Sequence, residues 1–229
     1  MTTGTATLLL TRPLAQSEEF LASCEGELGV RVPVVISPIL RISDVGEIPN
    51  LESYQTIIVT SGNAVARLGR EGILAGRNVA CVGEKTAQAA RDHGATARAL
   101  GADVEAFIAA SQSLEGRCLY LRGRHVSVDL VERLAEIGIN CDEVAIYDQI
   151  AQPISKAASV ILSGDVPIVA PIFSRRSAQL LAAHCQDRKG LSVLAVSDAV
   201  AKEWTGSGRV IVADEPTSEA MCAATIALL

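Results

Sequence analysis

Two stretches of the sequence place hydroxyl, amide and cationic side chains directly after an apolar run. Residues 57–65 read IIVTSGNAV, and residues 171–181 read PIFSRRSAQLL. Each apolar run has the length of a buried β-strand, and the polar residues would open the helix that follows. A Ser, Thr or Asn in this place is most often a helix N-cap. The helix N-terminal N–H groups that remain favour carboxylate or phosphate, so both junctions also predict anion binding.

Polar and cationic residues follow other predicted strands as well. In open parallel sheets, ligands bind outside the carboxyl ends of the strands. We therefore expect a polyanionic small molecule there, drawn by cations gathered at one edge of an acidic protein. The candidate binding residues are Thr11, Arg12, Thr60, Ser61, Gly62, Asn63, Lys85, Thr86, Arg122, Gly123, Ser174, Arg175 and Ser177.

Predicted strands and helices alternate along the chain, from a strand at 7–12 to a helix from about Thr217 to the end. This alternation predicts parallel sheets with helices on both faces. The order strand–Ser–helix, strand–helix, acidic loop–helix occurs twice, which favours two similar lobes, although chance similarity between such units is the alternative. The extended, Pro-marked segments 33–40 and 144–153 predict a two-stranded connector between the lobes.

We thus predict an α/β fold of two similar, flavodoxin-like parallel-sheet lobes joined by a two-stranded β connector. The predicted boundaries are 1–34 plus 152–229 for the first, discontinuous lobe, 35–40 and 145–151 for the linker, and 41–144 for the second lobe.

Composition narrows the class of protein. The chain has 229 residues, a length natural for two domains, and is 49% hydrophobic but only 3% aromatic. With a net charge of −6, it lacks the basic face that a nucleic-acid binder needs.

The six cysteines are scattered without a Cys-x-x-Cys, so buried free thiols are expected and a metal is not. The N-terminus has no basic region before its short apolar stretch, and no apolar run is long enough to span a bilayer, so we expect a cytoplasmic protein.

Several known motifs are absent from the sequence. It contains no Gly-x-Gly-x-x-Gly after a strand, no Walker loop and no Gly-x-Ser-x-Gly. Dinucleotide, nucleoside-triphosphate and serine-hydrolase chemistry therefore lose support.

The order of several motifs resembles the uroporphyrinogen-III synthase family. The motifs are LLLTRP, IIVTSGNAV, VACVGEKTAQAARDHG, LYLRG, VAIYDQIAQP, IFSRRSAQLL and EPTSEAM, which span nearly the whole chain. Each motif alone is loose, and the order and spacing carry the resemblance.

The resemblance implies two α/β lobes with the substrate in the cleft between them. It also implies closure of hydroxymethylbilane to uroporphyrinogen III, with inversion of the last pyrrole ring and loss of water. No metal or organic cofactor would be needed, and backbone amides would bind much of the substrate's carboxylate. A monomer that at most contacts the preceding enzyme transiently would be expected, with no nucleic acid or membrane partner.

Tyr147 matches the tyrosine of the family's Val-x-x-Tyr stretch, and the resemblance implies that it assists departure of the substrate's hydroxyl group. A half-buried strand tyrosine with a satisfied hydroxyl is the structural alternative. Thr86 matches the family pattern, but Ser197 and Asp198 stand where the family often has a Gly-x-x-Thr-like pattern. No binding threonine is therefore carried over to that position.

Two other functions stay open at this point. One is a non-catalytic two-lobed binding or sensor protein for a small polyanion. The other is an unrelated α/β transferase that acts on a phosphorylated small molecule.

Overall fold

The computed structural model describes residues 6–126 and 128–229. The first five residues of the predicted first lobe, and Ser127 of the predicted second lobe, lie outside the described residues. The chain divides into two compact units. Unit 1 combines the described residues up to Arg41 with Ile150–Leu229, and unit 2 is Ile42–Gln149.

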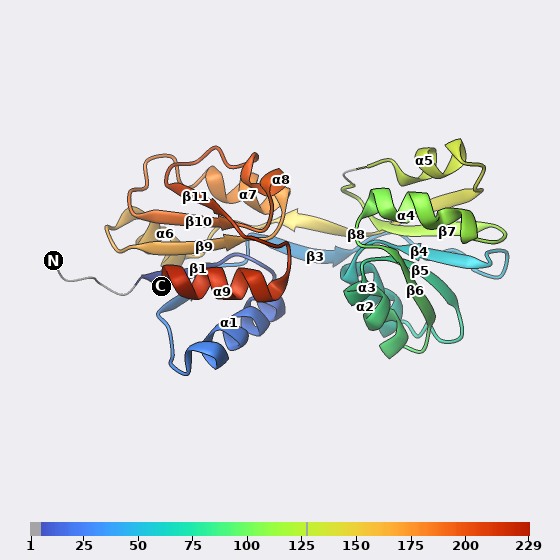
Figure 1. Cartoon of the computed structure of the whole chain (residues 1–229), viewed down its shortest axis with the longest axis horizontal. Helices are drawn as coiled ribbons and strands as arrows, with labels where there is room; N and C mark the ends of the chain where they lie inside the picture. The colour runs from blue at the N-terminus through green and yellow to red at the C-terminus, as the bar shows by residue number, and fades with distance from the viewer. Residues whose placement is uncertain (1–5, 127) are drawn as a thin grey trace. The chain divides into compact units, whose positions relative to one another are not determined.

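Unit 1 is a parallel sheet covered by helices (Figure 1). Its elements are β1 (Thr7–Leu10), α1 (Leu14–Leu28), β2 (Val34–Ile36), α6 (Lys156–Ser163), β9 (Ile168–Ile172), α7 (Arg175–Ala182), β10 (Leu191–Ala195), α8 (Asp198–Ala201), β11 (Arg209–Val212) and α9 (Ser218–Leu228). The strand order is β11-β10-β9-β1-β2. Counted along the chain this is 2-1-3-4-5, the flavodoxin order. The N-terminal strand β1 thus lies between β2 and β9.

Unit 2 is a second, largely parallel sheet. Its elements are β4 (Thr56–Val59), α2 (Gly62–Arg70), β5 (Asn78–Val82), α3 (Glu84–Asp92), β6 (Thr96–Gly101), α4 (Val104–Ala110), η1 (Ser111–Ser113), β7 (Cys118–Gly123), α5 (Leu130–Glu136) and β8 (Cys141–Ala151). β3 (Leu40–Asp44) adds an edge strand, and the order is β3-β8-β7-β4-β5-β6. From β4 onward this sheet is also doubly wound, with β4 at its centre and later strands added on both sides. The two α/β sheets confirm the predicted fold class, with a different strand order in each unit.

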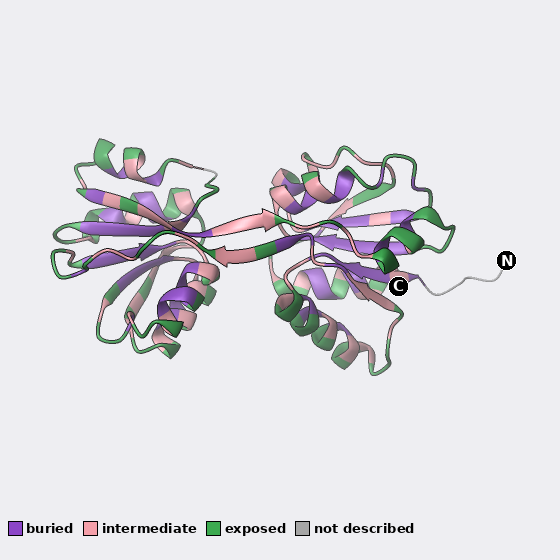
Figure 2. Ribbon diagram, turned by 180° about the vertical axis from the view of Figure 1, so that it is seen from behind, coloured by how far each residue is buried: buried purple, intermediate pink, exposed green. Residues whose placement is uncertain are grey.

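Alternating side chains on the central strands build a core on both faces of each sheet. In β1, Leu8 and Leu10 pack with residues of α1 and α9, whereas Leu9 packs with residues of α6 and α7. In β4, Ile58 packs toward α4 and α5, and its neighbour Val59 packs toward α2 and α3. Figure 2 shows the strands as the buried part of each unit and the helices with exposed outer faces. Burial on both faces explains why the strands are nearly continuous apolar runs.

The chain passes between the units within β3 and near the end of β8. These two strands are neighbours and run antiparallel, because Val45 N donates to Ile146 O (3.0 Å) while Gln152 N donates to Ile39 O (2.8 Å). The first segment of the predicted linker, 35–40, starts too early. Its first residues belong to β2, which pairs with β1 inside the sheet of unit 1.

Arg67 on α2 anchors the β3–β8 pair inside unit 2. Its guanidinium is buried and donates to three backbone carbonyls, those of Val45 (2.5 Å), Gly46 (3.0 Å) and Ile146. Nε pairs with Glu71 at 2.9 Å. A single side chain thereby satisfies carbonyl groups at the place where β3 ends beside β8.

Replacing Arg67 by Met should lower the free energy of unfolding of unit 2 by about 2–4 kcal/mol, because the partly buried carbonyl of Val45 would lose its guanidinium donor, the buried carbonyl of Ile146 would lose one of its two donors, and Glu71 would lose its buried partner. Urea denaturation measures this change. The control is Arg70→Met on the same helix, which removes only an exposed pair with Asp44 and should cost less than about 1 kcal/mol. Equal losses in the two variants would contradict an anchoring role for Arg67.

Candidate functional site

In unit 2 a cavity of about 280 Å³ lies where the strand order reverses. β4 and β7 are neighbours there, while the chain continues from β4 to β5 on the far side. Ligands of open α/β sheets bind at such a point, outside the carboxyl ends of the strands. Four predicted residues line this cavity: Thr60 and Ser61 after β4, Gly123 at the end of β7, and Tyr147 on β8.

The junction after β4 is a helix cap, as its sequence predicts. Ser61 has an extended backbone, and its Oγ accepts from Asn63 N at 3.2 Å. Gly62 and Asn63 lie in the first turn of α2. They contribute backbone N–H groups to the helix N-terminus and carry no charged side chain. The positive end of the helix dipole adds a partial charge that favours an anion.

Gly123 makes room for Tyr147. A Cβ placed on Gly123 would lie 2.7 Å from Cζ and 2.9 Å from the hydroxyl oxygen of Tyr147. The phenol ring therefore packs directly over the glycine backbone, and its residue is only 6% exposed. Within the described residues, the Tyr147 hydroxyl has no hydrogen-bond partner, which leaves it available to a molecule in the cavity.

Tyr120, which sequence reasoning missed, also lines the cavity. Its hydroxyl lies 2.9 Å from Thr60 Oγ1. Burial raises the pKa of Tyr120, and the nearby Tyr147 raises it further, while the hydrogen bond to Thr60 lowers it. In the sequence Tyr120 looks like any apolar strand residue. Its position in the sequence could have identified it, because Tyr120 lies on the strand that ends in the predicted binding residues Arg122 and Gly123.

Other predicted residues of unit 2 lie outside the lining of this cavity. Arg122 makes a double ion pair with Glu143, at 2.8 and 2.5 Å, and this interaction raises the pKa of Arg122. Lys85 and Thr86 lie in the first turn of α3, which begins after Gly83. Gly83 occupies the N-cap position of α3 and makes no side-chain cap hydrogen bond, unlike Ser61 at α2.

The carboxyl ends of β1 and β9 bring predicted residues of unit 1 together. Thr11 is buried, and the guanidinium of Arg12 lies 4.1 Å from the ring centroid of Phe173, next to Ser174. Burial lowers the pKa of Arg12, and the charge of Glu19 opposes this shift. β1 and β9 are the pair at which the order of this sheet reverses.

Ser174 caps α7. Its Oγ accepts from Ser177 N at 3.1 Å and lies 2.8 Å from Ser177 Oγ. Arg175, the first residue of α7, is exposed. At the end of the next strand, Ser197 has an extended backbone before Asp198 and α8, and its side chain makes no cap hydrogen bond.

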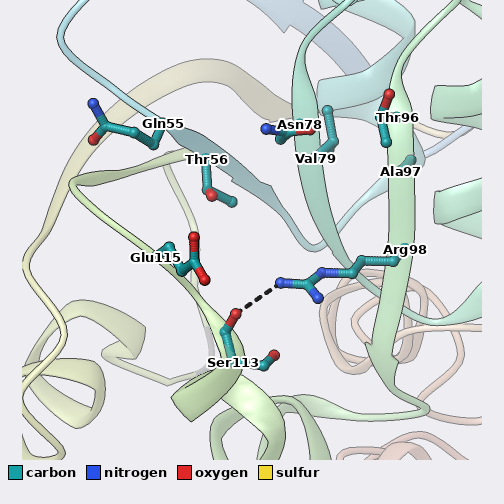
Figure 3. A pocket seen from close by; sticks show the side chains of 9 residues that line it. All are labelled: Gln55, Thr56, Asn78, Val79, Thr96, Ala97, Arg98, Ser113 and Glu115. Carbon is teal, nitrogen blue, oxygen red and sulfur yellow. Dashed lines mark hydrogen bonds between the residues drawn. The ribbon is translucent and has the colours of Figure 1, made fainter.

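A cavity of about 490 Å³ lies at the amino ends of the unit 2 strands, opposite to the carboxyl ends that carry the predicted site (Figure 3). It is lined by the first residues of β4, β5 and β6, namely Thr56, Asn78 and Thr96, so it is remote from the predicted site. Among the described residues, no group of three or more His, Cys, Asp and Glu side chains is placed to hold a metal ion. None of the helices in this described part is long and apolar enough to cross a membrane.

The family model of uroporphyrinogen-III synthase HemD matches residues 27–223, which include all of unit 2 and most of the second segment of unit 1. The chain belongs to the uroporphyrinogen-III synthase family. It is therefore a cyclising lyase that converts hydroxymethylbilane into uroporphyrinogen III, in porphyrin biosynthesis. The alternative of a non-catalytic binding protein is not favoured.

Solved structures of uroporphyrinogen-III synthases share the fold. The uroporphyrinogen-III synthetase of Helicobacter pylori is 14% identical with a TM-score of 0.72, covering 98% of this chain and 100% of that chain. A mutant uroporphyrinogen III synthase of Thermus thermophilus is 16% identical with a TM-score of 0.54, covering 96% of each chain. A search of the curated proteins found no match.

We expect Gly123→Ala to lower kcat because the added methyl group would displace the Tyr147 ring that packs over this position. A loss of about tenfold or more in kcat, with a normal far-ultraviolet spectrum, is the expected result of steady-state kinetics. Gly26→Ala is the control, since a Cβ at that glycine would meet no atom within 4 Å. Unchanged kinetics in Gly123→Ala would mean that the ring can shift without consequence.

Proposed function

We propose that this synthase holds its substrate through carboxylate contacts at the carboxyl ends of both sheets and uses Tyr147 to assist departure of the hydroxyl group. The observation that carries this proposal is the cavity of unit 2. It gathers Thr60, Ser61, Gly123 and Tyr147 at the point where the strand order reverses.

Carboxylate binding is expected from the groups that lie at the carboxyl ends of the two sheets. Hydroxymethylbilane carries acetate and propionate groups on every ring. The first turns of α2 and α7 present backbone N–H groups beside the caps Ser61 and Ser174, and these groups bind carboxylates well. Arg12 and Arg175 add charge-assisted hydrogen bonds in unit 1. In an acidic chain, such local placement is what attracts a polycarboxylate.

The role of Tyr147 rests on its available hydroxyl. The carbon–oxygen bond of the hydroxymethyl group breaks, and the leaving oxygen takes up a proton and departs as water. The phenol O–H can donate a hydrogen bond to that oxygen. The electron-rich pyrrole stabilises the cation that remains, so Tyr147 would act as a helper. The cationic carbon bonds to the last ring at the α-carbon that already carries the methylene bridge. The bond from that α-carbon to the bridge then breaks, and the bridge carbon bonds to the ring's free α-carbon, which loses a proton, so that the macrocycle closes with the ring inverted.

We also propose that the protein acts as a monomer in the cytoplasm. It would contact the enzyme that supplies hydroxymethylbilane at most transiently. Sedimentation of the purified chain with and without that enzyme would test it.

Tyr147→Phe should lower kcat at least about tenfold, equivalent to about 1.4 kcal/mol of barrier, because the donor to the leaving oxygen is lost. Turnover of hydroxymethylbilane, followed by oxidation and separation of the porphyrin isomers, measures this loss. Thermal unfolding should be unchanged.

Tyr54→Phe is the matched control for Tyr147→Phe. It removes a hydroxyl that donates to Asp142 at 2.8 Å and does not line the cavity. Wild-type kcat in Tyr147→Phe would show that the hydroxyl has no part in catalysis.

Arg175→Ala should raise KM by about tenfold or more with little change in kcat, because a charge-assisted contact is worth about 1.5–3 kcal/mol and less where water screens it. Arg12→Ala should raise KM too, but it also removes the contact with Phe173, so folding must be checked. Arg31→Ala is the control, because Arg31 is an almost fully exposed arginine of the same unit. Unchanged KM in both test variants would place these side chains on the solvated surface.

A further inference from the structure

A second cavity in unit 1 lies at the amino ends of β9, β10 and β11, away from Ser174 and Ser197. It measures about 670 Å³. Pro167 precedes β9, residues 186–190 precede β10, and Ser207 and Gly208 precede β11. The proposed substrate residues of this unit follow the opposite ends of the strands, so the cavity is a separate site.

The loops around this cavity are tied together by hydrogen bonds. Ser207 N donates to Cys185 O at 2.6 Å, and Ser207 Oγ lies 2.6 Å from Cys185 O and 2.9 Å from Arg188 O. The indole N–H of Trp204 donates to Ser207 O at 3.2 Å. The loop before β10 is therefore fixed against the loop before β11, and the wall of the cavity is formed in advance of any ligand.

Arg188 places a buried positive charge in that wall. The residue is 6% exposed, and its guanidinium donates to the carbonyls of Lys189 and Val166. Its Nε is buried without a hydrogen-bond partner, and no carboxylate of the described residues forms an ion pair with it. A buried charge without a counter-ion is costly, and an anion in the adjoining cavity would offset that cost.

Two further cations line the same cavity. Lys189 and Arg209 are exposed, and neither makes an ion pair within the described part of the chain. Asp187 is the single carboxylate in the lining, so the local charge is positive in a chain of net charge −6. The cavity of Figure 3 differs in this respect, because its lining holds one arginine, Arg98, which donates to Ser113 O, and one carboxylate, Glu115.

We propose that the unit 1 cavity binds a small polyanion bearing phosphate or several carboxylate groups, and that the bound anion stabilises this unit. Lys189 and Arg209 would contact the anion, while Arg188 attracts it from within the wall. The volume accommodates a molecule larger than a single phosphate ion. The proposal stands apart from the proposed function, because it concerns the other ends of the strands.

Thermal unfolding of the full chain tests this site with two probes, inorganic phosphate and citrate, each compared with sodium chloride at equal ionic strength. A ligand that binds only the folded state raises Tm increasingly as its concentration exceeds Kd. We expect a rise of several degrees for the wild type with at least one probe. The probe that acts identifies the anion class.

The variant Lys189→Gln/Arg209→Gln should lose more than half of that rise, and calorimetric titration should show at least about tenfold weaker binding, as expected for the loss of charge-assisted contacts. Lys156→Gln/Lys202→Gln removes the same charge from other positions of unit 1 outside the cavity lining and should keep the full rise. Arg175→Ala should also keep it, which separates this cavity from the proposed substrate residues. Equal rises in all variants, or none in the wild type, would overturn the proposal.

Discussion

The reversal of strand order in each sheet is the constraint on which the proposed site depends. In unit 1 the reversal falls between β1 and β9, and in unit 2 between β4 and β7. On either side of such a point the connecting helices leave in opposite directions along the sheet, so they do not cover the strand ends. The N-termini of α7 and α2, capped by Ser174 and Ser61, begin at these two points. A polycarboxylate substrate can thus be bound by main-chain donors, which places few demands on side-chain identity.

The proposed binding through the backbone is compatible with the 14–16% identity at which the solved synthases share this fold. Successive apolar side chains of β1 and β4 point to opposite faces of each sheet, and each face is covered by helices. Many combinations of Leu, Ile, Val and Ala can fill these two core layers. The caps Ser61 and Ser174 need only a short hydrogen-bonding side chain. The side chains that the geometry does restrict are few, and Gly123 is one of them because any Cβ would meet the Tyr147 ring.

Most of the fold was predictable from the sequence, since strand and helix periods, caps and apolar runs are local properties. The junctions at Ser61 and Ser174 are caps in the structure, as the local pattern indicates. The start of the β3–β8 pair was not predictable, because residues 33–40 read as one extended, Pro-marked segment whose pairing partners are distant in sequence. Tyr120 was missed for the same reason: only strand pairing brings it to Thr60. Likewise, the ion pair of Arg122 with Glu143 depends on the register of β7 and β8.

The two tyrosines of the cavity illustrate how environment separates residues of the same type. Tyr120 and Tyr147 come from adjacent parallel strands and line one small space. Tyr120 is committed to Thr60, and burial raises its pKa, so its phenol is held neutral and in place. Tyr147 lies over a glycine and has no such partner among the described residues. A hydroxyl that already has a partner must give it up before it can serve a leaving oxygen, whereas one without a partner gains a hydrogen bond when that oxygen arrives. The cost of reorganisation therefore favours Tyr147 as the donor, and Tyr120 as the residue that orients Thr60 beside it.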